Sequence, residues 1–224
     1  MTIGGIIVAA GGSTRMGGGD KLLLPLAGRP LISHSLACFD AHPRIDTIAV
    51  VASEANLDAL RSIAAGFPKA QVVLGGKRRR DSVLCGLDAL AECDIVVVHD
   101  AARPLVTSGL IDAAIDGAMD AGAALCAVPV SDTVKRGDGS GLVRTTVSRE
   151  DLWLAQTPQA FQAELLRRAH AAHDIDATDD AALVELIDAP VRLVPGNRDN
   201  VKVTTPEDLA LVEALLQARG YTSA

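Results

Sequence analysis

The feature that most constrains the fold of this 224-residue chain is a regular alternation of short apolar runs with longer segments of helical periodicity. Helical patterns lie near residues 30–38, 56–65, 82–91 and 108–121. Strands that alternate with helices are joined by right-handed crossovers, so this order predicts an α/β, three-layer, doubly wound fold with a mostly parallel sheet. The apolar runs are IGGIIVAA, DTIAVVAS, AQVVLGG, DIVVVHD and AALCAVPV.

The composition agrees with strands that are covered by helices on both sides. Hydrophobic residues make up 49% of the chain, but aromatic residues only 2%. The core must therefore be filled with Val, Leu, Ile and Ala, as in buried parallel sheets. The length suits one folding unit, and we expect residues 1–224 to form a single domain.

The alternation breaks at residues 131–154, where polar and β-branched residues flank the turn sequence GDGSG. Two extended runs around such a turn predict a β-hairpin. Because a two-stranded hairpin is marginally stable alone, we expect this arm to pack on a second subunit. Further on, Thr205 and Pro206 predict the N-cap and first turn of a last helix.

Charge, cysteine pattern and hydropathy exclude several classes of protein. A net charge of −7 argues against general nucleic-acid binding, which relies on many cationic contacts to phosphates. No apolar stretch is long enough to cross a membrane, and no signal-peptide pattern is present, so we expect a cytoplasmic protein. The four cysteines lack zinc-site spacing and are expected to be reduced thiols: Cys38, Cys85, Cys93 and Cys126.

The first strand leads into the glycine-rich sequence AAGGSTRMGGGDKLLLPL, which includes Arg15 and Lys21. Phosphates bind where a strand ends and a helix begins. The loop could be a dinucleotide cradle, a nucleoside-triphosphate site or a flexible turn. The G-x-G-x-x-G spacing of a dinucleotide site is absent, and the next helix is delayed to Pro30. This favours a loop that wraps a triphosphate, whose charge the two cations would neutralise.

Two further loops follow predicted strands. GGKRRRDSVLCGL holds the one strongly basic run of the sequence and places Ser82 near a predicted N-cap. VVVHDAARPLV ends a buried strand on Asp100, with Arg103 three residues later. A buried carboxylate needs a cation, a metal or a hydrogen-bond partner, so Asp100 could bind Mg²⁺ or ligand hydroxyls, or simply pair with Arg103.

With these loops the chain resembles the 2-C-methyl-D-erythritol 4-phosphate cytidylyltransferases of the non-mevalonate isoprenoid pathway. The resemblance implies a Rossmann-like nucleotidyltransferase fold and cytidylyl transfer from CTP to 2-C-methyl-D-erythritol 4-phosphate, with Mg²⁺ and release of pyrophosphate. It covers nearly the whole chain through AAGGSTRMGGGDKLLLPLAGRPL, GGKRRRDSVLCGL, VHDAARPLV, VPVSDTVKR, TVSREDLWLAQTPQAF, TDDAALVE and DNVKVTTPEDLALVE.

The resemblance also implies roles for individual residues. Arg15 and Lys21 would stabilise the transition state at the α-phosphate, and Arg149 and Lys202 would position the acceptor phosphate. Asp100 would face the acceptor hydroxyls or the metal. The nucleotide would be held by residues of the three loops: Ala9, Ala10, Gly11, Gly12, Gly75, Gly76, Arg79, Ser82, Asp100 and Ala101.

The acceptor site would be shared between subunits of a homodimer. Thr133 and Arg149 of the arm would complete the site of the neighbouring chain, while Asp100, Arg103, Thr157 and Lys202 contribute from within. Two anions repel one another, so several fixed cations and a metal are needed to join them. The phosphate nucleophile needs no general base, and His99 is therefore expected to be structural. Asp199 is a weaker candidate metal ligand than Asp100.

Three alternatives remain open at the level of sequence. A cytidylyltransferase for another polyol phosphate, such as ribitol 5-phosphate, would share the first three loops. A nicotinamide-dependent oxidoreductase would explain only a strand, a glycine loop and a helix. A non-catalytic nucleotide-binding or assembly protein would use the hairpin for dimerisation, but it would not require Arg15, Lys21, Arg149 and Lys202.

Overall fold

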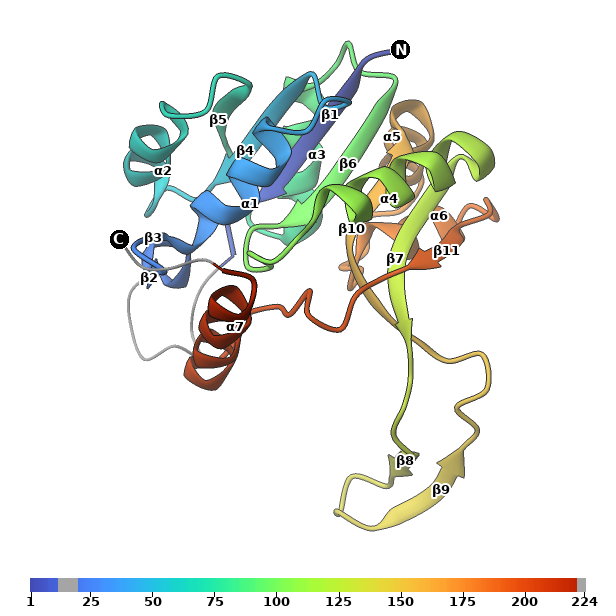
Figure 1. Ribbon diagram of the computed structural model, residues 1–224. Coiled ribbons are helices and arrows are strands. Elements are labelled where there is room, and N and C mark those ends of the chain that lie inside the picture. The colour runs from blue at the N-terminus through green and yellow to red at the C-terminus, as the bar shows by residue number, and fades with distance from the viewer. Residues whose placement is uncertain (12–19, 221–224) are drawn as a thin grey trace.

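The computed structural model describes residues 1–11 and 20–220. A seven-stranded sheet has the strand order β11-β7-β10-β6-β1-β4-β5 (Figure 1). β1 pairs in parallel with β4 and β6, whereas β10 is antiparallel to both of its neighbours. The predicted mostly parallel sheet is confirmed, with the strands β1 (Ile3–Val8), β4 (Thr47–Ala52), β5 (Ala70–Leu74), β6 (Ile95–Asp100), β7 (Ala123–Pro129), β10 (Trp153–Gln162) and β11 (Arg192–Pro195).

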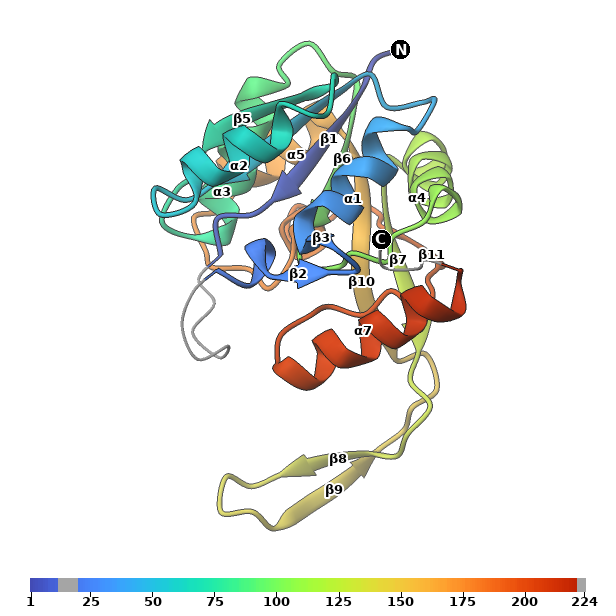
Figure 2. The ribbon, with the colours of Figure 1, turned by 60° about the vertical axis from the view of Figure 1, so that its left-hand side comes forward.

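Helices cover both faces of this sheet. Because neighbouring residues of a strand point to opposite faces, each strand contributes to two separate apolar clusters. Ile7 of β1 belongs to an apolar cluster with residues of α1 (Leu31–Asp40), α2 (Leu57–Ala64), α4 (Ser108–Ala121) and α7 (Pro206–Ala218). Ile6 belongs to a second cluster with residues of α3 (Arg79–Ala89), α5 (Ala163–Ala172) and α6 (Asp180–Glu185). The three-layer arrangement expected from the sequence is confirmed (Figure 2).

Capping residues fix the helix ends. The Thr107 hydroxyl accepts from the Leu110 amide at the start of α4, which has the bounds that the pattern predicts. Thr205 and Pro206 begin α7 as expected. The helix α3 is present as predicted, but its expected start near Ser82 is wrong: it begins at Arg79, and Ser82 lies inside the helix. The carboxylate of Asp81 accepts from the Arg78 amide at 3.2 Å, and this cap moves the helix start into the arginine run.

The strand β10 is the element that sequence patterns miss. They predict a hairpin as far as residue 154 and no strand directly after it, but Trp153–Gln162 forms a strand between β6 and β7. Its pairing register shifts between Ala155 and Gln159, so no regular alternation marks it. This insertion brings Thr157 beside the end of β6.

The hairpin itself is confirmed. β8 (Val134–Gly137) and β9 (Val143–Val147) form a separate two-stranded sheet that projects from the body of the molecule (Figure 1). At the turn, Gly139 and Gly141 have φ angles of 86° and 92°, which favour glycine. In the first crossover, η2 (Lys21–Leu23), β2 (Pro25–Leu26) and β3 (Arg29–Pro30) precede α1. Within the described ranges, no helix is long and apolar enough to span a bilayer.

Candidate active site

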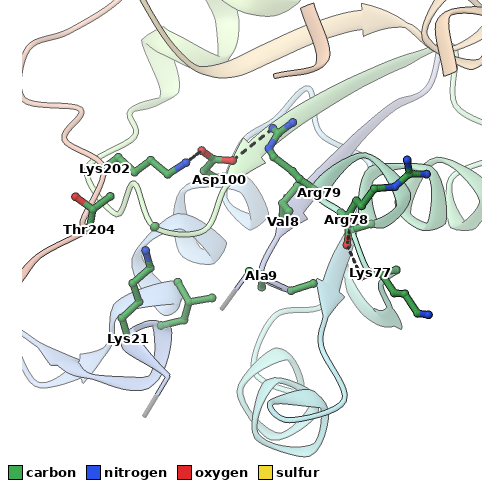
Figure 3. A pocket seen from close by; sticks show the side chains of 15 residues that line it. Val8, Ala9, Lys21, Lys77, Arg78, Arg79, Asp100, Lys202 and Thr204 are labelled. Atoms are coloured by element: carbon green, nitrogen blue, oxygen red, sulfur yellow. Dashed lines mark hydrogen bonds and ion pairs between the residues drawn. The ribbon is translucent and has the colours of Figure 1, made fainter. Parts of the chain in front are cut away.

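A pocket of about 280 Å³ lies at the carboxyl ends of β1 and β6, beside the start of α3 (Figure 3). Ligands bind at this edge of α/β sheets, where loops and helix N-termini converge. The wall combines small residues of the first loop with cations from three separate segments. Its lining residues are Val8, Ala9, Ala10, Gly11, Lys21, Leu22, Gly76, Lys77, Arg78, Arg79, Ser82, Asp100, Ala102, Lys202 and Thr204.

Asp100, the last residue of β6, is the centre of charge in this pocket. Lys202 Nζ lies 2.7 Å from its Oδ2, and Arg79 Nη2 lies 3.4 Å from its Oδ1. Figure 3 shows the two cations approaching the carboxylate from different sides. Burial would raise the pKa of Asp100, but the charges of Arg79 and Lys202 outweigh it and hold the pKa well below its usual range. The carboxylate therefore stays ionised.

The three arginines of the basic run at the start of α3 contact different partners. Arg78 pairs with Asp81 at 2.8 Å and with Asp174 at 2.6 Å. Arg80 donates to backbone carbonyls in and after the last turn of α5, including that of His170 at 2.9 Å. Arg79 is the member of the three arginines that reaches Asp100, and it is also the one to which the resemblance assigns a nucleotide contact. Arg80 therefore stabilises the fold, while Lys77, Arg78 and Arg79 line the pocket.

Lys21 enters the pocket from the end of the first glycine loop. Its Nζ donates to the carbonyl of Val203 at 2.9 Å, which ties the loop to the segment before α7. The buried Asn56 donates from one amide nitrogen to the carbonyl of Ala9 at 3.0 Å and to Asp20 Oδ2 at 2.5 Å. One side chain thereby fixes both ends of the loop. The predicted site residues Gly12 and Arg15 lie outside the described residues.

A second pocket of about 190 Å³ adjoins the first. Arg79, Asp100 and Lys202 line both, so these three side chains form the shared wall. Arg103 also lines the second pocket, and its Nη1 donates to the carbonyl of Asn200 at 2.7 Å. The remaining lining residues come from β10 and from the segment before α6: Ala155, Gln156, Thr157, Gln159, Thr178 and Asp179.

His99 is held beneath this second pocket rather than in it. Its Nδ1 lies 3.1 Å from Thr157 Oγ1, which also accepts from the Asp100 amide, and its Nε2 lies 3.1 Å from the Arg103 carbonyl. Burial lowers the pKa of His99 to about 4, so the ring is neutral near pH 7. The hydroxyl of Thr157 can donate to Nδ1 while Nε2–H donates to the carbonyl, which fits the expected structural role.

The structure groups most of the predicted site residues. Gly75 packs against Ser82 and Ala10, where a Cβ would come within 2.8 Å of the serine oxygen. Ala101 faces the core, and Ala102 lines the pocket in its place. The predicted site residues that line the first pocket are Ala9, Ala10, Gly11, Lys21, Gly76, Arg79, Ser82, Asp100 and Lys202. Arg103 and Thr157 line the second pocket.

Other predicted residues lie elsewhere. Thr133 and Arg149 are exposed on the arm and line neither pocket. Asp199 pairs with Arg219 at 3.1 Å and is also outside both linings, which argues against a metal-binding role. Sequence reasoning missed Thr204 and Thr178, since isolated threonines carry no distinctive pattern.

The described residues of the pocket do not form a metal site by themselves. Among the described residues, no group of three or more His, Cys, Asp or Glu side chains could hold an ion. Asp100 is the one acidic side chain in the described lining of the first pocket. Mg²⁺ is commonly held by one or two carboxylates together with substrate phosphates. A single ionised carboxylate in a pocket lined by several cations, where phosphates could bind, fits that pattern.

Comparison with known proteins identifies the family. Residues 3–218 match the family described as IspD, 2-C-methyl-D-erythritol 4-phosphate cytidylyltransferase. The protein of that name from Dehalococcoides mccartyi is 44% identical over 218 residues, 96% of either chain.

Solved structures agree with this match. The Thermus thermophilus 2-C-methyl-D-erythritol 4-phosphate cytidylyltransferase has a TM-score of 0.80 at 36% identity, covering 97% of this chain and 100% of that one. The 4-diphosphocytidyl-2C-methyl-D-erythritol synthase from Anaerococcus prevotii has a TM-score of 0.85 at 30% identity, covering 96% and 98%. The chain therefore belongs to the IspD family of 2-C-methyl-D-erythritol 4-phosphate cytidylyltransferases.

Proposed function

We propose that this chain transfers the cytidylyl group of CTP to 2-C-methyl-D-erythritol 4-phosphate and releases pyrophosphate, in the two adjoining pockets described above. The observation that carries the proposal is the shared wall of Arg79, Asp100 and Lys202. It gives two anionic ligands neighbouring sites with fixed cations between them. Family membership supplies the reaction to which this geometry is matched.

The nucleotide would occupy the first pocket. The glycine loops let its phosphates approach the backbone, and Arg79 and Lys21 bring positive charge to them. Lys21 and Arg15 would stabilise the charge that builds up at the α-phosphorus during in-line attack. The other proposed contacts are Ala9, Ala10, Gly11, Gly12, Gly75, Gly76, Ser82, Asp100 and Ala101.

The acceptor would occupy the second pocket. Its phosphate is the nucleophile and is largely a dianion near neutral pH, so the step needs no general base. Asp100 would accept hydrogen bonds from acceptor hydroxyls, with Arg103 and Thr157 beside it. Lys202 is already 2.7 Å from Asp100 and would hold the acceptor phosphate at the boundary with CTP.

Mg²⁺ is proposed to bind between Asp100 and the triphosphate. When bound, it would supply positive charge that lowers the repulsion between the two anionic substrates. Asp100 suits this task because its flanking cations keep it ionised. The chain's own contribution would be to hold that carboxylate at the end of β6.

We further propose a homodimer in which Thr133 and Arg149 of one arm complete the acceptor site of the other subunit. Both residues are exposed and line neither pocket of their own chain. The arm also leaves Leu142 69% and Val143 64% exposed. Apolar side chains on a projecting hairpin are typical of a surface that another chain covers.

A pyrophosphate-release assay with CTP and Mg²⁺ tests the reaction and the acceptor together. We expect turnover with 2-C-methyl-D-erythritol 4-phosphate and little with ribitol 5-phosphate. A preference for ribitol 5-phosphate would contradict the proposed acceptor. Tight binding of NADH with none of CTP would instead support an oxidoreductase, and CTP binding without turnover on any acceptor would indicate a non-catalytic protein. A cytoplasmic location stays a prediction.

A further inference from the structure

Asp180 is a buried carboxylate that the proposed reaction does not use. It is the first residue of α6, and its side chain is only 1% exposed. It lines neither of the two pockets, so a ligand bound there does not touch it. A buried carboxylate is costly without a compensating cation. That cation is Arg79, whose Nη1 lies 2.7 Å from Asp180 Oδ2.

The same guanidinium also reaches the pocket. Its other terminal nitrogen, Nη2, lies 3.4 Å from Asp100 Oδ1. Because guanidinium is planar and its donors are fixed relative to one another, holding Nη1 largely fixes where Nη2 points. Asp180 therefore holds Nη1 of Arg79 on the side away from the pockets, while Nη2 faces Asp100 and both pockets.

Hydrogen bonds at the start of α6 fix the position of Asp180. Gln159 of β10 is buried, accepts from the Ala181 amide at 3.2 Å and donates to Asp179 Oδ2 at 2.8 Å. Asp179 also caps α6 by accepting from the Ala182 amide at 3.0 Å. These contacts fix the first turn of α6 against the sheet, and with it the carboxylate that holds Arg79.

The buried His170 beside Asp180 does not compete with Arg79. His170 Nε2 lies 3.9 Å from Asp180 Oδ1, and both side chains are 1% exposed. Burial and the nearby charges of Arg80 and Arg79 lower the pKa of His170 to about 4. The ring is therefore neutral near pH 7, and the compensating positive charge comes from Arg79.

We propose that Asp180 is a positioning residue for nucleotide binding: it holds Nη1 of Arg79 while Nη2 exchanges Asp100 for a phosphate oxygen of CTP. This rests on the proposed role of Arg79 as a nucleotide ligand. The ligand then meets a guanidinium that folding has already oriented, which reduces the entropy lost on binding. Without Asp180, the guanidinium would be held by Asp100 alone, and the incoming phosphate would have to displace that single contact.

The first test is Asp180→Asn, which keeps the shape and removes the charge. We expect the KM for CTP to rise by about tenfold or more, the usual cost of a lost charge-assisted contact. Because Asp180 lines neither pocket, kcat and the acceptor KM should change much less. The matched control is Asp174→Asn, which also removes ion pairs to arginines at the start of α3, those to Arg78 and Arg80, but at a residue 79% exposed. It should leave the KM for CTP unchanged.

A double-variant cycle separates this inference from the proposed function. Arg79→Gln should raise the KM for CTP, and adding Asp180→Asn should raise it no further, because Asp180 acts only through Arg79. If Arg79→Gln leaves CTP binding unchanged, the nucleotide role of Arg79 fails. If Arg79→Gln weakens CTP binding but Asp180→Asn does not, or if the two effects add, only the positioning role is wrong.

Arg79→Lys gives a second measurement in case Asp180→Asn does not fold, as thermal unfolding would reveal. Lysine keeps the positive charge, but one ammonium does not reproduce the fixed fork that joins Asp180 to Asp100. We expect calorimetric titration to show CTP bound about tenfold more weakly. Wild-type affinity in folded Arg79→Lys would overturn the proposal.

Discussion

The charged residues of the sheet-and-helix body and those of the arm, residues 131–154, differ in the partners that they have within the chain. At the pockets, Arg79 and Lys202 pair with Asp100 of the same chain. On the arm, Arg149 donates to the backbone carbonyl of Ser131, and among the described residues it has no ion pair. Cations in the body are thus oriented by folding, whereas those on the arm have most of their donors directed to solvent.

Burial explains this difference. Asp100 is 8% exposed, so its charge must be compensated within the chain. Arg149 loses little by remaining in water, where an ion pair would add little stability. The comparison indicates that the body is prepared to bind anions alone, whereas the arm needs a second chain to become part of a site.

The largest expected effect is in the body. Lys21→Ala should lower kcat by about 10²–10³-fold, because its charge is proposed to act mainly in the transition state. The KM for CTP should change less. Steady-state kinetics with calorimetric CTP titration measures both, and equal losses in rate and affinity would make Lys21 an ordinary ligand contact.

The next effect is on the arm. Arg149→Ala should raise the acceptor KM by about tenfold while the KM for CTP stays the same, since only one charged contact to the acceptor is lost. Arg144→Ala, on β9 of the same arm, is the control and should leave both constants unchanged. An unaltered acceptor KM in Arg149→Ala would contradict the role of the arm in the acceptor site.

Mixing the two variants tests whether the site is shared. Random exchange between Lys21→Ala and Arg149→Ala chains makes half of the dimers mixed. If each site combines one body with the partner's arm, one site of every mixed dimer contains neither substitution. About a quarter of wild-type activity should then return at low acceptor concentration. No recovery, despite subunit exchange, would show that each chain builds its own site.

The smallest expected effect concerns the neutral histidine under the pocket. Burial lowers the pKa of His99 to about 4 in the folded protein, against about 6.5 in the unfolded chain. Between these pH values the unfolded state binds more protons, so the free energy of unfolding should fall as the pH drops from 6.5 to 4. His99 contributes at most about 3 kcal/mol to this loss.

His99→Gln should flatten that dependence, because glutamine does not titrate. Urea unfolding at several pH values measures the difference between the two slopes. His170, whose pKa is also lowered to about 4, contributes to both proteins and leaves a residual slope. An identical slope in variant and wild type would show that His99 is not protonated on unfolding in this range.

Much of the architecture could be predicted from local patterns. The bounds of α4, the Thr205 cap of α7 and the hairpin all follow from capping residues and turn glycines, which act over a few positions. The expected start of α3 is wrong because Asp81 caps the Arg78 amide, so that the helix begins at Arg79, three residues before Ser82. The single-domain organisation and the roles of Gly12 and Arg15 stay predictions.

The strand β10 and the proposed positioning role of Asp180 could not be predicted from local sequence patterns. β10 has a register shift and antiparallel pairing to strands distant in sequence, so its stability comes from β6 and β7. Asp180 has the same sequence signature as any acidic residue in the first turn of a helix. Only its burial against Arg79 distinguishes it.

The sequence by itself determined the layer order, the three ligand-facing loops and the family, because strand periodicity, glycine spacing and fixed motifs are written along the chain. Tertiary structure decided that Arg79, among Arg78, Arg79 and Arg80, reaches Asp100, whereas Arg78 pairs with Asp174 and Arg80 donates to backbone carbonyls. The physical reason is that buried charges must find partners in space. Those partners, Asp100 and Asp180, are 80 residues apart in the chain and meet only through Arg79.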